Sequence, residues 1–173
     1  MGESGKPFFG GFMKETSLHD AVRTSALGAG LSPQQVEMLA GLVGRETFDA
    51  DEVIAREGTV DDRLVLVVDG TLDIVRHRGT PDETVLATLR AGDLGHELGF
   101  LDGTPCYASL VAATAAQVLL LERTRLESLI DSEPRLLYAV MRAILRSTHA
   151  LQTRLSTQAS ELTNYVVKQH GRY

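Results

Sequence analysis

The sequence predicts a mainly β fold with helices (α+β), in which a β-sandwich or jelly roll is preceded by short helices and followed by a long helix. Between residues 47 and 122, short runs of Val, Leu, Ile and Thr alternate with turn signals. A spacing of roughly ten residues between turns is typical of sandwiches and jelly rolls. On both sides of this region, apolar residues recur at helical spacing instead.

Composition limits the possible classes of protein. A chain of 173 residues with a formal net charge of -6 suits one domain with an added helical element. Its acidic balance argues against a general nucleic-acid binder. The single cysteine excludes an internal disulfide framework and multi-cysteine metal sites, and fits a reducing cytoplasm. No apolar run approaches the ~20 residues of a membrane span, so no membrane contact is expected.

The first elements are two short helices after a flexible tail, expected over residues 1–15. Residues 16–28 fit a helix capped by Thr16 or Ser17. A second helix starts at Ser32, with Pro33 at its first position and a capping-box glutamine three residues after the cap. We expect Gly44 to end this second helix.

The middle of the chain contains the predicted strands. Loose alternation of polar and apolar residues over 47–55 favours the first of them. Asp69-Gly70 follows a run of branched residues and is a strong hairpin signal. The other predicted strands are 64–68, 71–76, 84–89, 109–113 and 116–122.

The last predicted element is a long helix from Pro134 to about Val167, assigned to a segment 134–168 that follows a domain over 16–133. Its apolar positions step by three and four, as in a coiled coil, and predict a parallel homodimer through residues 141–165. The alternative is a helix packed on its own barrel. The seam positions are Met141, Ile144, Thr148, Leu151, Leu155, Gln158, Leu162 and Tyr165.

The stretch 90–109 lies between two predicted strands and carries the residues most relevant to function. It is rich in glycine and contains one histidine (His96), one glutamate (Glu97) and the only cysteine (Cys106). A glycine-rich segment between strands can direct several backbone N–H groups at one point, which suits an anion.

Several short motifs, in order and at suitable intervals, resemble the cyclic nucleotide-binding domain family. This family includes the bacterial cAMP receptor protein, protein kinase A regulatory subunits and cyclic-nucleotide-gated channels. The resemblance covers about residues 18–150 and implies a double-stranded β-helix jelly roll. The motifs are Arg56-Glu-Gly58, Leu66-Val-Val-Asp-Gly70, Gly92-Asp93, Glu97-Leu98 and Pro105-Cys-Tyr-Ala-Ser109.

The family's phosphate-binding cassette can be compared with this chain position by position. In the family, a glutamate binds the ribose 2′-hydroxyl and an arginine neutralises the cyclic phosphate. Glu97 matches the glutamate, but His96 stands at the preceding glycine and Cys106 at the arginine. The resemblance implies a ligand site made of His96, Glu97, Leu98, Gly99, Cys106, Tyr107, Ala108 and Ser109.

These two departures predict an altered ligand site. Leaving a partly buried charge contact unmade costs about 2–5 kcal/mol, which would weaken a micromolar affinity by roughly 30-fold to several thousand-fold. We therefore expect a regulatory module with weak, different or no cyclic nucleotide binding. One alternative is a working cAMP or cGMP sensor that uses His96 or Arg90 for the phosphate. A second is a structural domain that binds a protein partner.

The roles of His96 and Cys106 stay open at the level of sequence. His96 fits a replacement phosphate donor with pH-dependent binding, a haem or metal ligand, or an ordinary loop histidine. Cys106 fits a redox sensor, for which only His96 could supply the cationic neighbour, or a small residue in the space of the arginine.

Catalysis and DNA binding are not expected. No two of the five histidines lie at the spacing of an enzymatic jelly-roll metal site, so we expect no enzyme activity, no metal and no obligate cofactor. The chain ends soon after the long helix, so we expect no DNA-binding domain and no contact with nucleic acid.

Overall fold

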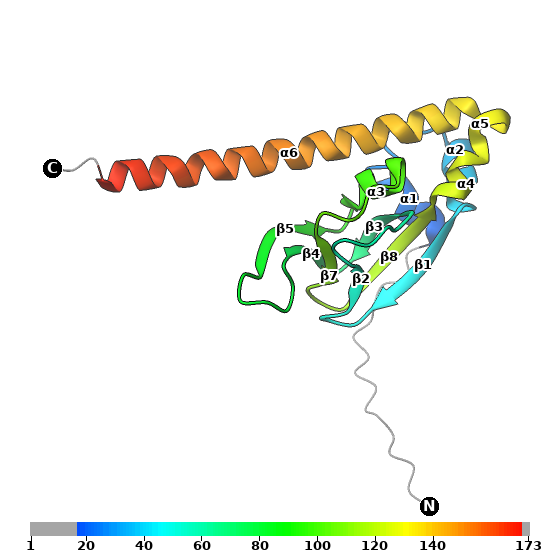
Figure 1. Cartoon of the computed structure of the whole chain (residues 1–173). Helices are drawn as coiled ribbons and strands as arrows, with labels where there is room; N and C mark the ends of the chain where they lie inside the picture. The colour runs from blue at the N-terminus through cyan, green and yellow to red at the C-terminus, as the bar shows by residue number, and fades with distance from the viewer. Residues whose placement is uncertain (1–16, 171–173) are drawn as a thin grey trace, which may run out of the picture.

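The computed structural model of the chain describes residues 17–170, and within them the side chains of 17–154, 156–157 and 159–160. Two antiparallel four-stranded sheets form a jelly roll, with strand orders β1-β8-β3-β6 and β2-β7-β4-β5 (Figure 1). The strands are β1 Val43–Phe48, β2 Val53–Ala55, β3 Arg63–Asp69, β4 Thr71–Arg76, β5 Thr84–Arg90, β6 Leu94–Gly95, β7 Ser109–Ala112 and β8 Ala116–Glu122. The helices are α1 Leu18–Thr24, α2 Pro33–Ala40, α3 Glu97–Asp102, α4 Arg123–Glu127, α5 Leu129–Ser132 and α6 Pro134–His170.

The two N-terminal helices begin at the predicted caps. The Ser17 hydroxyl accepts a hydrogen bond from the Asp20 N–H in α1, and Ser32 forms the expected capping box with Gln35 in α2. The prediction that Gly44 ends α2 is wrong, because the helix ends at Ala40 and Gly44 lies in β1 opposite Leu120. Pairing with β8 overrides the helical spacing at this point. The expected tail over residues 1–15 lies outside the described residues.

The predicted hairpin at Asp69-Gly70 is also wrong, although the strands on both sides of it are correct. β3 pairs with β6 and β8, whereas β4 pairs with β5 and β7 in the other sheet. Gly70 has φ +77, and a Cβ at this position would lie 2.3 Å from the Ala115 carbonyl oxygen. The glycine therefore permits a tight corner between sheets instead of a hairpin turn.

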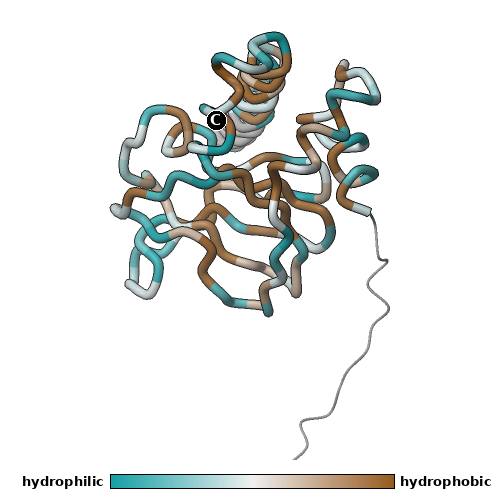
Figure 2. Tube along the Cα trace, turned by 90° about the vertical axis from the view of Figure 1, so that its right-hand side faces the viewer, coloured by the Kyte–Doolittle hydropathy of each residue, from teal (hydrophilic) through white to brown (hydrophobic). Residues whose placement is uncertain are grey.

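Two apolar cores flank the sheet that contains β3 and β8. In β3, Leu64 and Leu66 face a cluster with the helices, and Val65 and Val67 face the inside of the barrel. Burial on both faces explains why this strand is continuously apolar. Figure 2 shows the hydrophobic residues concentrated on the inner strands and the hydrophilic ones in the outer loops.

The first half of α6 packs on its own barrel. Leu136, Val140, Ala143 and Ile144 are buried, and Leu151 packs against the barrel core. Seam positions from Met141 to Leu151 thus face this chain, as the alternative interpretation of the helix expected. The later seam positions Leu155, Gln158, Leu162 and Tyr165 lie outside the described side chains.

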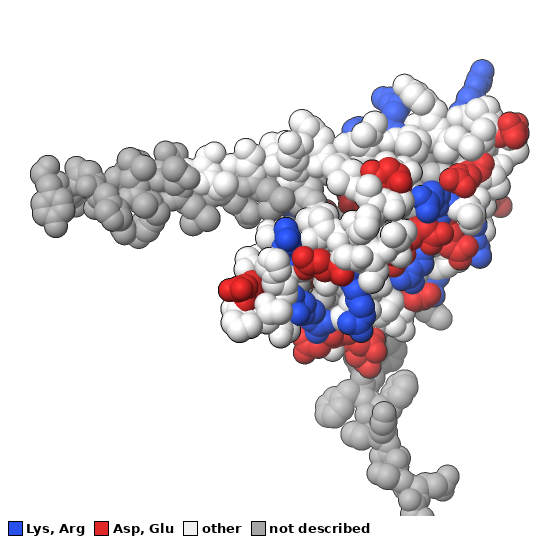
Figure 3. Space-filling view, in the orientation of Figure 1, with Lys and Arg blue, Asp and Glu red and all other residues white. Residues whose placement is uncertain are grey.

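Two further observations on the described residues concern the hydropathy of the helices and the charge of the surface. None of its helices combines the length and apolar character that a membrane crossing requires. On the face seen in Figure 3, acidic and basic side chains are intermixed over the barrel.

Candidate functional site

The stretch 90–109 encloses a cavity of about 170 Å³ between the barrel and α6, here called the cassette cavity. All eight residues of the predicted ligand site line it. The lining is completed by six further residues: Ile74, Thr104, Pro105, Leu110, Thr148 and Leu151.

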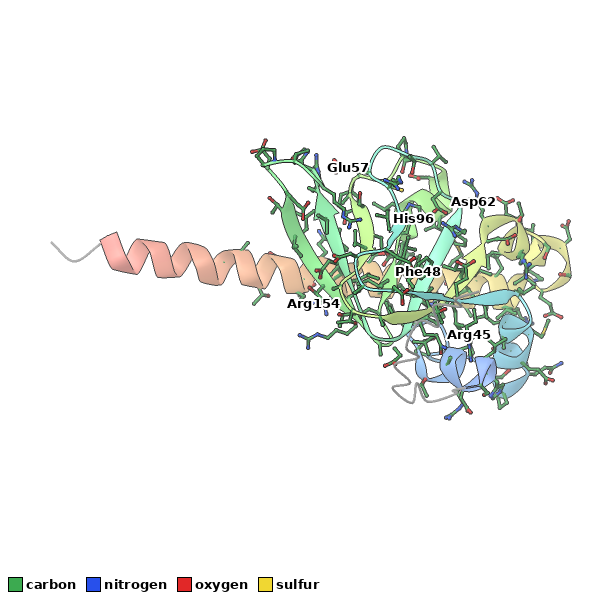
Figure 4. The ribbon with its side chains drawn as sticks, turned by 90° about the horizontal axis from the view of Figure 1, so that it is seen from below. Arg45, Phe48, Glu57, Asp62, His96 and Arg154 are labelled. Atoms are coloured by element: carbon green, nitrogen blue, oxygen red, sulfur yellow. The ribbon has the colours of Figure 1, made fainter. Side chains whose placement is uncertain are left out.

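The backbone of His96 directs its imidazole toward Cys106. His96 is the N-cap of α3 and has left-handed backbone angles, φ 67 and ψ 26. Its Nδ1 lies 3.1 Å from the Arg63 carbonyl oxygen, and its Nε2 lies 2.8 Å from the Cys106 Sγ. Because a carbonyl can only accept, Nδ1 carries the proton and Nε2 accepts from the thiol. In Figure 4, His96 lies within the outline of the barrel.

Gly99 makes this ring position possible. A Cβ on Gly99 would lie 2.7 Å from both Cε1 and Nε2 of His96, and 3.2 Å from the Thr104 carbonyl oxygen. Any larger residue would push the imidazole out of its place. Gly99 therefore shapes the cavity indirectly, by leaving free the space that the His96 ring occupies.

Cys106 is fixed by its backbone at the floor of the cavity. Its N–H donates to the Thr59 carbonyl, and its carbonyl accepts from the Gly58 N–H, both at 2.8 Å. The side chain is 5% exposed. Burial, with a smaller contribution from the Asp61 carboxylate, raises the pKa of the thiol. The protonated thiol is consistent with an S–H donor to His96.

Among the described residues, Glu97 is the one acid that lines the cavity, and one of its carboxyl oxygens lacks a hydrogen-bond partner. It is 8% exposed, and its Oε1 has no hydrogen-bond partner. Burial raises the pKa of the Glu97 carboxyl, Asp93 raises it further, and the nearby Thr148 hydroxyl partly offsets the rise. A buried polar atom without a partner is costly, so this carboxyl is suited to a ligand that forms a hydrogen bond with it.

The remaining predicted residues contribute shape more than charge. Leu98 and Tyr107 are exposed at the rim, whereas Ala108 and Ser109 are buried. The Ser109 hydroxyl accepts from the Glu57 N–H at 3.0 Å and is already engaged.

None of the described residues that line the cassette cavity is a lysine or an arginine. Arg90, an alternative phosphate ligand at the level of sequence, is exposed at the end of β5 and does not line the cavity. Arg146 and Arg154 line a separate hollow of about 410 Å³ beside α6. There Arg146 donates to the Ala29 carbonyl, and Arg154 pairs with Asp93 at 3.6 Å.

Sequence reasoning did not foresee two features of this site. Thr148 and Leu151 were assigned to a helical seam, but they line the cavity. Thr148 and Leu151 are three residues apart, and this spacing fits a helical seam and a cavity lining equally well. The contact between His96 and Cys106 was not foreseen either, since nothing in the sequence shows that residues ten apart in a loop meet. In the described part of the chain, no three His, Cys, Asp or Glu side chains cluster as metal ligands would.

Several known proteins share sequence or fold with this chain. A family model described as a cyclic nucleotide-binding domain matches residues 45–133. A cyclic nucleotide-gated potassium channel from Rhizobium etli is 29% identical over 142 residues, which cover 78% of this chain and 38% of the channel. The cyclic AMP receptor protein of Thermus thermophilus is 29% identical over 113 residues, which cover 65% of this chain and 52% of the receptor. The chain therefore spans about half of these relatives or less.

A solved structure shares the fold over most of its length. The crystal structure of a cyclic nucleotide-binding domain from Methylobacillus flagellatus KT matches with a TM-score of 0.73 at 22% identity. The match covers 82% of this chain and 80% of that chain, so the two share the fold over most of their length.

Proposed function

Because the chain belongs to the cyclic nucleotide-binding domain family, we propose that it is a regulatory ligand-binding module whose cassette binds cyclic nucleotides weakly or not at all. The observation that carries the proposal is the contact between His96 and Cys106. These residues stand at the family's glycine and arginine, and together they fill the place where the phosphate would be held.

Charge supports this proposal. A cyclic phosphate needs a cation or several free donors, and a guanidinium supplies both in a bidentate contact. Here the imidazole nitrogens are taken by the Arg63 carbonyl and by the Cys106 thiol. Glu97 adds an acid to a cavity lined by neither lysine nor arginine. An ionised carboxylate would repel a phosphate, so the electrostatics favour an uncharged ligand.

The volume of the cassette cavity also supports weak or absent binding of cyclic nucleotides. Ligand pockets usually measure about 300–1,000 Å³, whereas this cavity is about 170 Å³. Thr148 and Leu151 close it from α6. A nucleotide would need this helix to move outward.

Isothermal titration calorimetry of the full chain with cAMP, cGMP and cyclic dinucleotides tests the proposal. The expected result is no binding tighter than about 30 µM, since the missing charge contact weakens a micromolar affinity by a factor of roughly 30 or more. Adenosine serves as the uncharged comparison. Micromolar binding of any of the cyclic nucleotides would contradict the proposal and favour a working sensor.

We further propose that α6 joins two copies of this chain. In Figure 1 the helix extends well past the barrel, and the predicted seam continues into that segment. Sedimentation velocity of the chain truncated after His149 provides the test. A dimer that becomes a monomer is the expected result, and an unchanged mass would contradict the helical contact.

A further inference from the structure

We propose that Cys106 and His96 form a reactive thiol–imidazole pair that adds to small α,β-unsaturated carbonyl compounds entering the cassette cavity. This inference does not depend on how weakly cyclic nucleotides bind. It concerns a covalent step at the same place, and its test uses no nucleotide.

The first argument is the orientation of the pair. The Arg63 carbonyl holds the proton on Nδ1 of His96, so the lone pair of Nε2 faces the Cys106 Sγ at 2.8 Å. A base at hydrogen-bond distance from a nucleophile, itself oriented by a third group, is the arrangement that activates a cysteine. Gly99 maintains it by leaving room for the ring.

The second argument is independent of the pair and comes from Glu97. Glu97 is 8% exposed, lines the same cavity and has a buried Oε1 with no partner. A carboxyl whose pKa is raised by burial can hold a proton and donate it to a carbonyl oxygen. The cassette cavity is thus lined by a nucleophile (Cys106), a base (His96) and an acid (Glu97).

The remaining lining selects the class of electrophile. Ile74, Leu98, Leu110 and Leu151 make the walls apolar, and no lysine or arginine attracts an anion. A small uncharged enal, enone or quinone meets these requirements, because it carries one acceptor oxygen on an apolar frame.

The chemical step is a conjugate addition that needs no further reactant. The Cys106 proton moves to Nε2 of His96 as Sγ attacks the β-carbon and the carbon–carbon π bond breaks. The enolate oxygen is held by the Glu97 carboxyl, and the proton on His96 returns to the α-carbon. One S–C bond and one C–H bond form, one S–H bond and one π bond are lost, and no oxidation occurs.

The charged and titratable groups around the pair are few. Asp61 approaches from the segment before β3, Arg63 binds Asp61 through its guanidinium at 2.6 Å, and Glu97 lies on α3. Burial raises the pKa of Asp61, but hydrogen bonds from Arg63 outweigh that effect and lower it overall. Asp61 is therefore ionised near neutral pH and can stabilise a protonated His96.

The test is the rate at which the folded full chain adds N-ethylmaleimide, followed by intact mass. Cys106 is the only cysteine in the sequence, so every adduct reports on this site, and Cys106→Ser must give none. His96→Asn is the informative variant, because asparagine tolerates the left-handed backbone but is not a base. General base catalysis predicts a rate about 100-fold lower in His96→Asn near pH 7.

The pH profile separates catalysis from a structural effect. A thiol without a base reacts as thiolate, and its rate rises about tenfold per pH unit below its pKa. We expect this rise in His96→Asn and a nearly level rate between about pH 6.5 and 8 in the native chain. Glu97→Gln should slow the maleimide reaction but leave iodoacetamide, which forms no enolate, within about twofold.

Three results would overturn the inference. They are a rate for His96→Asn within about twofold of the native chain, a tenfold rise per pH unit in the native chain, and no reaction of the native chain under conditions in which the urea-unfolded chain reacts. Circular dichroism of each variant confirms that the compared chains are folded.

Discussion

At the scale of single residues, the candidate site depends on a contact between two side chains. His96 and Cys106 lie ten positions apart, yet their side chains meet at 2.8 Å. The two side chains depend on each other, because the buried thiol and the imidazole nitrogen each supply the hydrogen-bond partner of the other. A change at one of these positions leaves the other with an unmet hydrogen bond, so we expect their effects on stability to be non-additive.

The glycine beneath the imidazole gives a first prediction. Gly99→Ala places a methyl group 2.7 Å from the His96 ring, so the contact with Cys106 should break. Overpacking of this kind costs about 1–3 kcal/mol of the free energy of unfolding, measurable by urea denaturation. Gly44→Ala is the matched control, because nothing lies within 4 Å of a Cβ there. Equal losses in both variants would refute the tight packing.

Glu97 gives a second prediction, on pH. Burial raises its pKa above the ordinary value of 4.5, so the folded state holds the proton more tightly than the unfolded state. The native chain therefore loses stability as pH rises through the pKa of the folded state. Glu97→Gln does not ionise and should gain stability over the native chain at pH 8 but not at pH 4. Urea denaturation at both values checks this, and a gain of equal size at both would contradict it.

At the scale of elements, the sequence predicts helix starts and strands correctly where their formation depends on residues close by in the chain. The caps at Ser17 and Ser32 and the strand 71–76 depend on neighbours in the chain, and they were predicted correctly. The turn at Gly70 was misjudged, because a hairpin and a corner between sheets have the same local signal and differ only in distant pairing.

The cassette and α6 show the same limit. The resemblance was enough to identify eight residues that share one cavity, but not the ring position of His96, which depends on Arg63 33 residues earlier. In α6, a spacing of three and four residues fits both a coiled coil and a helix on a barrel. The barrel decides which face of α6 is buried, and the periodicity of the helix sequence alone does not identify that face.

Adjacent residues of α6 give a third prediction. Ile144 is fully buried against the barrel, whereas Leu145 is 62% exposed. Ile144→Ala should lower the free energy of unfolding by about 2–5 kcal/mol through lost burial and a cavity. Leu145→Ala should change it by less than about 0.5 kcal/mol when the chain is monomeric, as denaturation at low concentration can establish. Similar losses at both positions would mean that the helix packs on another face.

At the scale of the whole molecule, α6 links the cavity to the rest of the structure. Thr148 and Leu151 close the cassette cavity, and Arg154 forms an ion pair with Asp93 where the helix leaves the barrel (Figure 4). Both partners of this pair are partly exposed, so it contributes little to stability. A ligand that fills the cavity beyond its present volume would have to displace α6. Such a ligand changes the position of the helix only if it binds the displaced state more tightly.

The central claim is that His96 and Cys106 set the low affinity of this cassette for cyclic nucleotides. Calorimetric titration of cAMP into the double variant His96→Gly/Cys106→Arg tests it most directly, with His96→Gly alone as the control without added charge. The arginine should restore a charged contact worth about 2–5 kcal/mol, so the double variant should bind cAMP at least about 30-fold more tightly than the native chain. Equal affinities of the folded double variant and the native chain would contradict the claim.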